Sequence, residues 1–313
     1  MSWPAVALLG PTAAGKTALA FALADRYPVH LISVDATLVY RGLAIGAAQP
    51  TAAELAAYPH ELIDIRDPAD PYSAADFLAD ARAAMARARE AGRIPLLVGG
   101  TMLYFRALQD GLAALPEARP AFRAALEDRL ATEGLSALIE TLQAQDPEAA
   151  RRVDLKNPRR VLRALEIMDA SGERASVLWD RPTVRPLEKD GFSLQCFGLW
   201  PEDRAALHAR IETRFDAMIG AGWLEEAAAL RARGDLSPAV PALRAVGYPQ
   251  WFAHLDGALS FEEARAAGLA ATRQLARRQL TWLRGWEGLQ RLPLGSDFAL
   301  PSVSSLAKAF PCP

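Results

Sequence analysis

Residues 10–17, GPTAAGKT, constrain the fold of this chain more than any other segment. They have the form G-x-x-x-x-G-K-[ST], whose glycines allow backbone N–H groups to turn toward a bound phosphate. Residues 5–9 are apolar and predict a buried parallel strand. Residues 17–27 are rich in Ala and Leu and end before Pro28, which predicts a helix. A strand, a phosphate-binding loop and a helix in this order predict an α/β fold with a P-loop NTPase-like parallel sheet core.

The residues of this loop have distinct expected roles. Its backbone N–H groups, with the partial positive charge of the helix N-terminus, are expected to hold phosphate oxygens. Lys16 is expected to reach the terminal phosphates, and the Thr17 hydroxyl to ligate Mg²⁺. The predicted phosphate-binding residues are Gly10, Pro11, Thr12, Ala13, Ala14, Gly15, Lys16 and Thr17.

Further strands alternate with helices in the first third of the chain. Residues 29–35 predict a second strand that ends in Asp35, and residues 94–98 predict a buried strand followed by Gly-Gly-Thr101. Residues 62–65 predict one more short strand, and helices are expected over 73–91 and 101–109. In such sheets ligands bind at the carboxyl ends of the strands. We therefore expect one cleft to be lined by Thr12, Lys16, Asp35 and Thr101.

The pattern then changes to helices without strands, including helices over 120–132 and 157–170, which predicts an all-helical domain inserted into the core. A strand over 192–199 returns the chain to the sheet, and helices are expected over 203–219, 224–233 and 261–282. We therefore expect residues 1–115 to form the first part of the P-loop core and residues 116–190 to form the helical insertion. Residues 191–295 are expected to form the second part of the core with its basic helices, and residues 296–313 a Pro/Ser-rich, loosely held tail.

Composition excludes several classes of protein. Hydrophobic residues make up 51% and charged residues 23%, as in soluble globular domains. There is no apolar run near eighteen residues and no basic-then-apolar leader, so we expect a cytoplasmic monomer without a membrane partner. Two distant cysteines, Cys196 and Cys312, and four histidines without ligand spacing predict neither a disulfide framework nor a zinc site.

Positive charge is concentrated although the net charge is −2. Residues 151–163 carry six basic side chains against Asp154, and residues 273–284 carry four arginines and no acid. Arg273, Arg277 and Arg284 are expected on one helical face, a pattern that suits either phosphates or solvent. Trp282 and Trp286 have the chemistry to stack on bases, but burial in the core is the expected position of both.

The loop alone does not identify its phosphate. An NTPase usually has an Asp that closes a second apolar strand, whereas residues 94–98 end in Gly-Gly-Thr, and there is no N-K-x-D base-recognition motif. Asp35 and Asp64 remain as candidate acids, and Asp64 is equally well explained as a capping residue. Asp35 lies where a small-molecule kinase accepts a substrate proton, and where another nucleophile could attack beside a bound diphosphate.

Six segments together resemble the bacterial tRNA dimethylallyltransferases: GPTAAGKT, ISVDATLVYRGLAIGAAQP, LIDIRDPADPYSAADF, IPLLVGGTMLYFRAL, NPRRVLRALEIMDASG and ARRQLTWLR. The resemblance extends over residues 8–284, in the order of that family. It implies a P-loop core whose helical insertion grips tRNA and whose loop holds the diphosphate of dimethylallyl diphosphate. The family transfers the dimethylallyl group, with Mg²⁺, to N6 of the adenosine 3′-adjacent to the anticodon (A37) in tRNAs that read codons beginning with U.

The family's motifs assign roles to residues of this chain. They imply that Asp35 is the general base, that Thr101 is catalytic, and that residues 12–17 hold the diphosphate. Arg210 and Arg214 are explained equally well as a lid over the diphosphate or as helix-surface ion-pair partners. The implied tRNA contacts are Asp35, Ala36, Thr37, Leu38, Thr101, Arg123, Arg159, Arg160, Val161, Leu162, Arg163, Arg244, Ala245, Val246, Gly247, Tyr248 and Pro249.

The chain departs from the family pattern at four places. Ala36 replaces a Ser, Arg159 replaces a Gln, and Pro249 replaces an Arg. In the family's D-I-G-T-A-K-P segment the acid, the hydroxyl and the base are replaced by Ala44, Ala47 and Gln49. These departures affect individual tRNA contacts and leave the phosphate-binding and catalytic residues intact.

Three other functions are weighed against this one. A small-molecule kinase would place ATP on the loop and use Asp35 as base, but it would not explain the helical insertion or the two basic segments. An isopentenyltransferase acting on free adenine nucleotides would not need a basic insertion. A non-catalytic P-loop RNA-binding protein would leave Asp35 and Thr101 without a role.

Overall fold

The computed structural model describes residues 2–116, 119–181, 183, 185–236 and 240–310. The chain forms two compact units, one made of residues 1–109 and 186–313 and the other of residues 110–185. The second unit begins six residues before, and ends five residues before, the insertion expected at 116–190.

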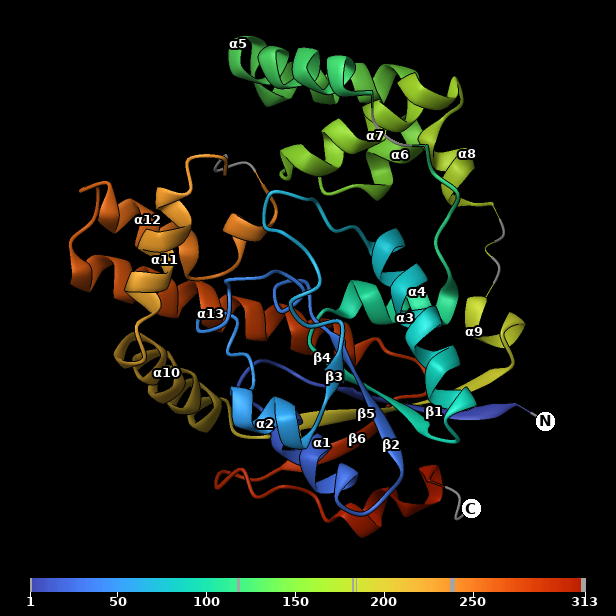
Figure 1. The fold of residues 1–313 in the computed structure, drawn as a ribbon. Coiled ribbons are helices and arrows are strands. Elements are labelled where there is room, and N and C mark those ends of the chain that lie inside the picture. Colours follow the sequence, from blue (N-terminus) through green and yellow to red (C-terminus); the bar gives the residue numbers. More distant parts are fainter. Residues whose placement is uncertain (1, 117–118, 182, 184, 237–239, 311–313) are drawn as a thin grey trace. The chain divides into compact units, whose positions relative to one another are not determined.

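A parallel sheet of six strands forms the centre of the first unit, in the order β3-β2-β4-β1-β5-β6 (Figure 1). The expected α/β fold with a parallel sheet core is confirmed. The strands are β1 (Trp3–Leu9), β2 (Val29–Val34), β3 (His60–Glu61), β4 (Ile94–Gly99), β5 (Phe192–Pro201) and β6 (Gln290–Leu294).

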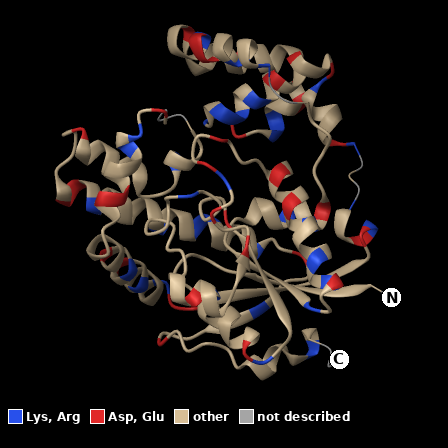
Figure 2. Ribbon diagram, in the orientation of Figure 1, with Lys and Arg blue, Asp and Glu red and all other residues tan. Residues whose placement is uncertain are grey.

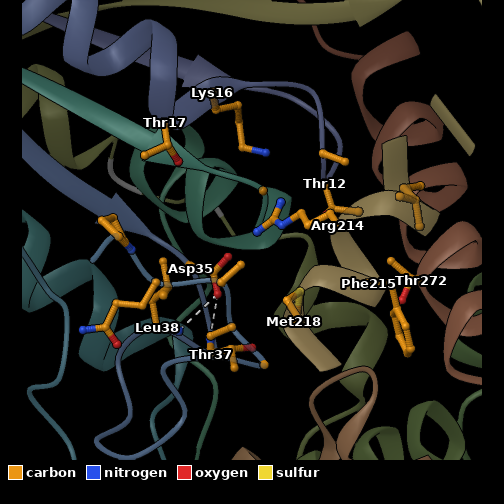
Figure 3. A pocket seen from close by; sticks show the side chains of 18 of the residues that line it. Thr12, Lys16, Thr17, Asp35, Thr37, Leu38, Arg214, Phe215, Met218 and Thr272 are labelled. Atoms are coloured by element: carbon orange, nitrogen blue, oxygen red, sulfur yellow. Dashed lines mark hydrogen bonds between the residues drawn. The ribbon is translucent and has the colours of Figure 1, made fainter. Parts of the chain in front are cut away.

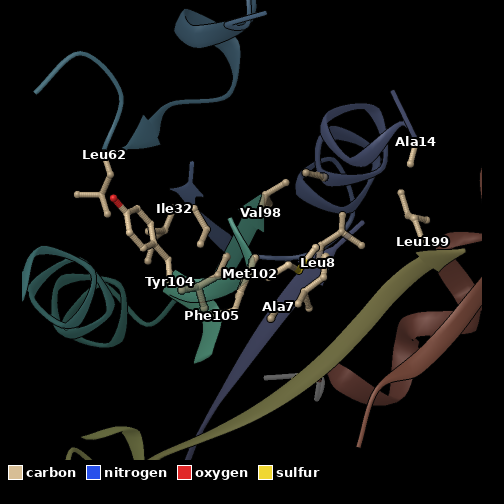
Figure 4. Packing of buried hydrophobic residues seen from close by; sticks show 14 of the residues in the cluster. Ala7, Leu8, Ala14, Ile32, Leu62, Val98, Met102, Tyr104, Phe105 and Leu199 are labelled. Carbon is tan, nitrogen blue, oxygen red and sulfur yellow. The ribbon is translucent and has the colours of Figure 1, made fainter. Parts of the chain in front are cut away.

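The central strands are apolar along their whole length because helices cover both faces of a parallel sheet. In β1 the last five residues are all buried, and in β4 all six are. Leu8, Ile32 and Val98 pack together with Met102 and Phe105 from the helix that follows β4 (Figure 4). This packing fixes the carboxyl ends of β1, β2 and β4 at one edge of the sheet.

The six helices predicted in this unit are present in the predicted order, with bounds that differ by at most three residues, whereas the helices over residues 52–57, 186–189 and 248–255 were not predicted. Ser73 and Ser260 form capping boxes at the starts of α3 and α13, as a hydroxyl with an acid three residues later predicts. The helices are α1 (Lys16–Ala24), α2 (Ala52–Ala57), α3 (Ala74–Glu90), α4 (Met102–Asp110), α9 (Pro186–Lys189), α10 (Arg204–Gly220), α11 (Trp223–Ala232), α12 (Tyr248–Leu255), α13 (Phe261–Arg284) and the 3₁₀ helices η1 (Ala242–Arg244) and η2 (Val303–Ala309).

One predicted strand is absent, and the edge strand β6 was not predicted. Residues 62–65 do not form a strand, because Leu62 and Asp64 have φ angles of 66° and 54°, outside the extended region. Strand β6 was not predicted, because Pro293 interrupts its apolar pattern. β6 lies at the edge of the sheet, where a residue without an N–H is tolerated.

The predicted loose tail is also wrong for its described part. Leu306 and Ala309 of η2 are buried in the core of the first unit. The Phe310 ring stacks on Tyr27 with a centroid separation of 4.5 Å. Apolar side chains spaced between the Pro and Ser residues therefore anchor this segment, while residues 311–313 lie outside the described part of the chain.

Every regular element among the described residues of the second unit is a helix, and these helices share an apolar core of their own. Leu138, Leu142, Val161 and Ile167 are central to that core. The buried Asp146 accepts hydrogen bonds from the backbone N–H groups of Ala149 and Ser176 and from the Ser176 hydroxyl, which ties α6 to α8. The helices are α5 (Pro120–Gln145, bent at Gly134), α6 (Pro147–Arg152), α7 (Pro158–Ser171) and α8 (Ala175–Trp179).

Of the helices in the described residues, none combines the length and the apolar character that a membrane-crossing segment requires.

Candidate active site

A cavity of about 840 Å³ opens at the carboxyl ends of β1, β2 and β4 in the first unit (Figure 3). The phosphate-binding loop forms one wall, and Asp35, Thr37 and Leu38 form another. Helices α10 and α13 contribute Arg214 and Gln279, which lie far from these loops in the sequence. Thr12, Lys16 and Asp35, three of the four residues expected at one cleft, therefore line a single cavity.

The phosphate loop is shaped around the Lys16 side chain. Gly15 has a φ of 90°, a conformation that glycine adopts without strain, and it begins α1. The Lys16 ammonium donates hydrogen bonds to the carbonyl oxygens of Gly10 (3.0 Å) and Pro11 (2.8 Å). These contacts hold the ammonium inside the loop, next to the backbone N–H groups of the motif.

Three cations and two carboxylates line the cavity: Lys16, Arg210, Arg214, Asp35 and Glu54. Burial and the positive charge of Arg214 lower the pKa of Lys16 to about 8, although Asp35 acts in the opposite direction. Burial also lowers the pKa of Arg214, as does the nearby Arg210, while Asp35 again raises it. Burial is the largest cause of both shifts, and the lining cations outnumber the lining carboxylates, so a bound anion would stabilise the charged forms of Lys16 and Arg214.

Arg210 and Arg214 have different roles in α10. Arg210 donates a 3.1 Å hydrogen bond from Nε to the carbonyl oxygen of Ala13 and packs over the Phe298 ring, 4.6 Å from its centroid. Arg214 extends into the cavity (Figure 3). Both arginines line the cavity, and neither forms an ion pair with a described residue. Of the two explanations given for them, a position over the bound diphosphate therefore fits better than ion pairing on the helix surface.

The Asp35 carboxylate is oriented by the turn that follows β2. Its Oδ1 accepts hydrogen bonds from the backbone N–H groups of Thr37 (2.8 Å) and Leu38 (3.3 Å). Oδ2 makes no hydrogen bond with any described residue, which leaves one oxygen able to accept a proton from a substrate. Figure 3 shows Asp35 among the side chains that line the cavity, with dashed lines from one carboxylate oxygen to the turn.

Thr101 lies next to Asp35 through a backbone contact. The backbone N–H of Ala36 donates a 3.0 Å hydrogen bond to Thr101 Oγ1, which leaves the threonine proton free to be donated elsewhere. Because this contact uses the backbone of residue 36, the replacement of Ser by Ala does not remove it.

Gln279 is a site residue that sequence reasoning missed. Its Oε1 accepts the backbone N–H of Thr12 and its Nε2 donates to the carbonyl oxygen of Gly100, both at 2.9 Å. A Cβ on Gly100 would lie 2.4 Å from Nε2, so residue 100 must be glycine for this approach. Gln279 lies within the family-like segment ARRQLTWLR, but nothing local indicates that its amide spans two loops.

Glu226 was also missed. Its carboxylate accepts the backbone N–H groups of Ile45 (2.7 Å) and Gly46 (2.9 Å) and the Tyr248 hydroxyl (2.7 Å). It thereby holds the segment in which the chain departs from the family pattern. In that segment Gln49 donates to Asp64 Oδ2 at 2.7 Å, which explains Asp64 as a structural acceptor.

The tRNA contacts expected over 244–249 divide into three groups. Ala245 and Val246 line the cavity. The Tyr248 side chain is fully buried, with its ring packed against Trp223 and its hydroxyl bound to Glu226, and the tRNA contact expected of this residue stays a prediction. Gly247 precedes α12, and Pro249 lies in the first turn of that helix, where no N–H is required. Pro249 is exposed, and so is Arg244 at the end of η1.

The contacts expected in the second unit differ in exposure. Arg159 and Arg160 are exposed on α7 and have no ion-pair partner among the described residues. Figure 2 shows the positions of Lys and Arg in blue along the ribbon, several of them on the helices of this unit. Val161 and Leu162 are buried in the helical core, because they occupy the inner face of the amphipathic helix α7, and the tRNA contacts expected of them stay predictions. The remaining two, Arg123 and Arg163, both form ion pairs with the buried Glu166.

The residues that could hold a metal ion are few. In the described ranges, no three His, Cys, Asp or Glu side chains lie together as a metal site. The Thr17 hydroxyl at the start of α1 is exposed and makes no hydrogen bond with any described residue. Mg²⁺ often takes only one or two protein ligands and completes its shell with substrate phosphates and water, so one hydroxyl beside a phosphate loop fits its requirements.

Comparisons with known proteins agree on one family. A family model described as IPP transferase matches residues 38–286. A tRNA dimethylallyltransferase of Bordetella petrii is 53% identical over 281 residues, which covers 90% of this chain and 89% of that one. The tRNA dimethylallyltransferase of Chromohalobacter salexigens is 52% identical over 304 residues, covering 97% and 96% of the two chains.

Solved structures are similar over nearly the whole chain. A tRNA isopentenylpyrophosphate transferase from Bacillus halodurans is 34% identical with a TM-score of 0.69, covering 97% of this chain and 93% of that one. A eukaryotic dimethylallyltransferase acting on tRNA has the same fold, with 22% identity and a TM-score of 0.77, and covers 98% of this chain and 76% of its own. By these matches in sequence and structure, the chain belongs to the IPP transferase family.

Proposed function

We propose that this protein transfers the dimethylallyl group of dimethylallyl diphosphate to N6 of A37 in tRNA and releases diphosphate. The observation that carries the proposal is that one cavity is lined by the phosphate loop, by the cations Lys16 and Arg214 among others, and by Asp35, whose carboxylate has one oxygen without a hydrogen bond. Lys16 and Arg214 favour a polyanion, and Asp35 supplies the proton acceptor. Membership of the family and the names of the two curated relatives support the reaction class.

The phosphate loop would bind the diphosphate as a leaving group. Negative charge develops on its oxygens as the allylic C–O bond breaks, because the electron pair of that bond remains with the diphosphate. Lys16, Arg214 and the loop N–H groups would stabilise this charge within the cavity. In this reaction no nucleotide is hydrolysed, which agrees with a strand β4 that ends in Gly-Gly-Thr in place of an acid.

Asp35 would take the proton from the adenine amine. N6 of adenine is a poor nucleophile, since its lone pair is delocalised into the ring. As the N6–carbon bond forms, the amine proton would pass to Oδ2, the oxygen that the turn leaves without a hydrogen bond. The Thr101 hydroxyl already accepts a hydrogen bond from the backbone N–H of Ala36. It would donate its own proton in a hydrogen bond to the adenine base and so hold N6 in line with the allylic carbon.

A magnesium ion would be held by the Thr17 hydroxyl together with oxygens of the diphosphate. When bound, it would supply further charge neutralisation on the leaving group. Thr17 lies in the first turn of α1, directly after the lysine of the loop, which is the position this chemistry needs.

The tRNA would be gripped through its phosphates, and its base would be extruded. Within a stacked anticodon loop N6 is shielded, so A37 would leave the stack and enter the cavity at a cost of a few kcal/mol. Lys156, Arg159 and Arg160 are exposed on the second unit without ion-pair partners in the described residues, and they suit the RNA backbone.

One set of assays tests the proposal against its alternatives. The protein is incubated with Mg²⁺ and labelled dimethylallyl diphosphate in the presence of tRNA or of AMP, and separately with ATP. We expect label on tRNA, none on AMP and no ATP turnover. ATP turnover without label on tRNA would point to the kinase alternative, label on AMP to the nucleotide enzyme, and RNA binding without either to a non-catalytic protein.

A further inference from the structure

The segment that follows β6 packs against the phosphate loop. Leu300 is 40% exposed, yet its Cδ2 atom lies so near Gly15 that a Cβ on that glycine would be 3.0 Å away. Two residues earlier, Phe298 is only 5% exposed, and the Arg210 guanidinium lies over its ring, 4.6 Å from the centroid. Neither Phe298 nor Leu300 lines the cavity, so both contact the site without bordering the space for a ligand.

Arg210 joins this segment to the phosphate loop. Its Nε donates to the carbonyl oxygen of Ala13 at 3.1 Å, while its guanidinium lies over the Phe298 ring. The side chain also lines the cavity, and its two terminal nitrogens make no hydrogen bond with any residue that the structure describes. The terminal N–H groups of this cation are therefore left for an anion in the cavity.

Both partners of Arg210 have a backbone conformation that residues with side chains rarely adopt. Ala13 has a φ of 63° and Phe298 a φ of 53°, in the left-handed region that favours glycine. Such conformations persist only where the surrounding contacts hold them, and they concentrate at ligand clamps and active sites. At residue 298 a turn, in which the backbone N–H of Phe298 donates to the carbonyl oxygen of Gly295 at 3.1 Å, presents the ring to Arg210.

The rest of the segment is anchored to the same loop–helix unit. Leu306 of η2 is buried, and Phe310 stacks on Tyr27, which follows the end of α1. Leu300 contacts Gly15 at the start of that helix. The segment therefore contacts the chain at both ends of α1, and the Phe298 ring has a fixed support.

Other arginines near α10 are held by acids. Arg265 of α13 pairs with Glu212 and Asp216, and Arg273, which was expected in a basic stripe with Arg277 and Arg284, pairs with Glu212. A carboxylate occupies the N–H groups of a guanidinium and balances its charge. An aromatic face attracts the same cation and leaves its N–H edge unoccupied. Arg210, held by a ring and one carbonyl oxygen, keeps its charge and its terminal donors for a ligand.

We propose that Phe298 is a positioning residue that holds the Arg210 guanidinium beside the phosphate loop, where its terminal nitrogens bind the diphosphate. An arginine side chain loses rotamer freedom when it binds an anion, and a ring that already holds it reduces that loss on binding. This role rests on the proposed function. It adds that the segment after β6, which the sequence describes as a loose tail, is part of the anion site.

The test compares Phe298→Leu with Phe298→Tyr in the full-length protein. Leu keeps an apolar side chain without an aromatic face, whereas Tyr keeps the ring. The Kd for inorganic diphosphate with Mg²⁺ is measured by calorimetry, and KM is measured for dimethylallyl diphosphate and for tRNA. We expect Phe298→Leu to raise the Kd for diphosphate and the KM for dimethylallyl diphosphate about tenfold, with KM for tRNA unchanged. Phe298→Tyr should retain the wild-type values.

A matched control and a double variant separate positioning from packing. Phe310→Leu makes the same substitution in the same segment, at a ring that stacks on Tyr27, so it should lower the melting temperature and leave the Kd for diphosphate unchanged. Arg210→Gln removes the cation and should raise that Kd at least as much as Phe298→Leu. In the double variant the Kd should equal that of Arg210→Gln alone, because the ring acts only through the arginine.

Each outcome bears on Phe298 or on the proposed function separately. If the wild type labels tRNA and Phe298→Leu binds diphosphate as tightly as the wild type, the positioning role is wrong and the function stands. If Phe310→Leu raises the Kd equally, or if the effects add in the double variant, Phe298 contributes packing alone and the positioning role is overturned. If the wild type binds diphosphate but transfers no label, the proposed function fails, and a raised Kd in Phe298→Leu still supports positioning. Should Phe298→Leu not fold, Phe298→Met takes its place, and an unchanged Kd in Arg210→Gln overturns the role by itself.

Discussion

Gln279 accepts the backbone N–H of Thr12 at 2.9 Å, across 267 positions of the sequence. The other end of the same amide donates to Gly100, the residue before Thr101. One buried side chain on α13 therefore connects the loop proposed to hold the diphosphate with the loop proposed to hold the adenine. Because the oxygen and the nitrogen of the Gln279 amide are both hydrogen-bonded, this side chain fixes the distance between the two loops.

We predict that Gln279→Met lowers kcat/KM for transfer about tenfold or more with little change in fold. The variant keeps the volume but loses both hydrogen bonds, so the two loops are less precisely placed. Gln279→Glu keeps an acceptor for Thr12 and adds negative charge beside the phosphate loop, so it should raise KM for dimethylallyl diphosphate more than Gln279→Met does. Gln274→Met, an exposed change on the same helix, is the control. Equal kinetics for Gln279→Met and wild type would show that the bridge is dispensable.

Asp35→Asn is expected to lose transfer while keeping the structure of the turn. The amide oxygen of Asn can still accept from Thr37 and Leu38, but the side chain can no longer take a proton. A general base typically contributes 10²- to 10⁴-fold, so kcat should fall by about that factor while RNA affinity remains. Single-turnover transfer and anisotropy measure the two quantities. Undiminished transfer by Asp35→Asn would exclude Asp35 as the proton acceptor.

The sequence was sufficient where structure is encoded locally. The segment from β1 through the phosphate loop to α1 is contiguous, and its apolar strand and glycines determine it without help from the rest of the chain. Asp35 was likewise predictable, since a strand that ends in an acid delivers it to the sheet edge. The helix α3 was predicted because Ser73 caps it visibly.

The sequence was insufficient where a side chain acts on a distant segment. Gln279 and Glu226 bind backbone groups 267 and about 180 positions away, and a hydrogen bond to the backbone leaves no pattern in the residue types that it joins. Trp282 and Trp286 were both expected in the core, but Trp282 is exposed and only Trp286 is buried. Only the position of α4 against α13 decides which is exposed.

The lowered pKa of Lys16 predicts how diphosphate binding depends on pH. Its pKa is about 8 in the folded protein against an ordinary value of 10.5, and the protonated form is the one that binds an anion. The Kd for dimethylallyl diphosphate should therefore be constant below about pH 8 and rise above it, by up to tenfold per pH unit. Calorimetric titration between pH 7 and 9.5 measures this, and Lys16→Arg, which stays charged, should remove the dependence. A Kd that is flat to pH 9.5 in the wild type would contradict the prediction.

The same shift has the opposite effect on the stability of the ligand-free protein. Between pH 8 and 10.5 the unfolded chain keeps a proton on Lys16 that the folded chain has lost. Stability rises with pH wherever the unfolded state binds more protons. The contribution of Lys16 to the free energy of unfolding should therefore increase over this range, and it should be absent in Lys16→Arg.

Arg214→Gln is predicted to weaken diphosphate binding and to raise the pKa of Lys16. A hydrogen bond between charged groups contributes about 1.5–3 kcal/mol, so KM for dimethylallyl diphosphate should rise roughly 10- to 100-fold. Removal of the second cation also removes one cause of the lowered Lys16 pKa, so the pH at which Kd begins to rise should move upward. Arg204→Gln, an exposed change on the same helix, is the control and should do neither. An unchanged KM in Arg214→Gln would show that this arginine does not meet the diphosphate.

Glu226→Gln is predicted to destabilise the segment over the cavity. The carboxylate accepts three hydrogen bonds, from Ile45, Gly46 and Tyr248, whereas the NH₂ group of Gln would face at least one of these donors. An unsatisfied buried donor costs about 1–3 kcal/mol, so the free energy of unfolding in urea should fall by about that amount. Tyr248→Phe removes a single bond and should cost less, about 1 kcal/mol. The effects should not be additive in the double variant, because both changes disrupt the same cluster, and full additivity would show that the two side chains act independently.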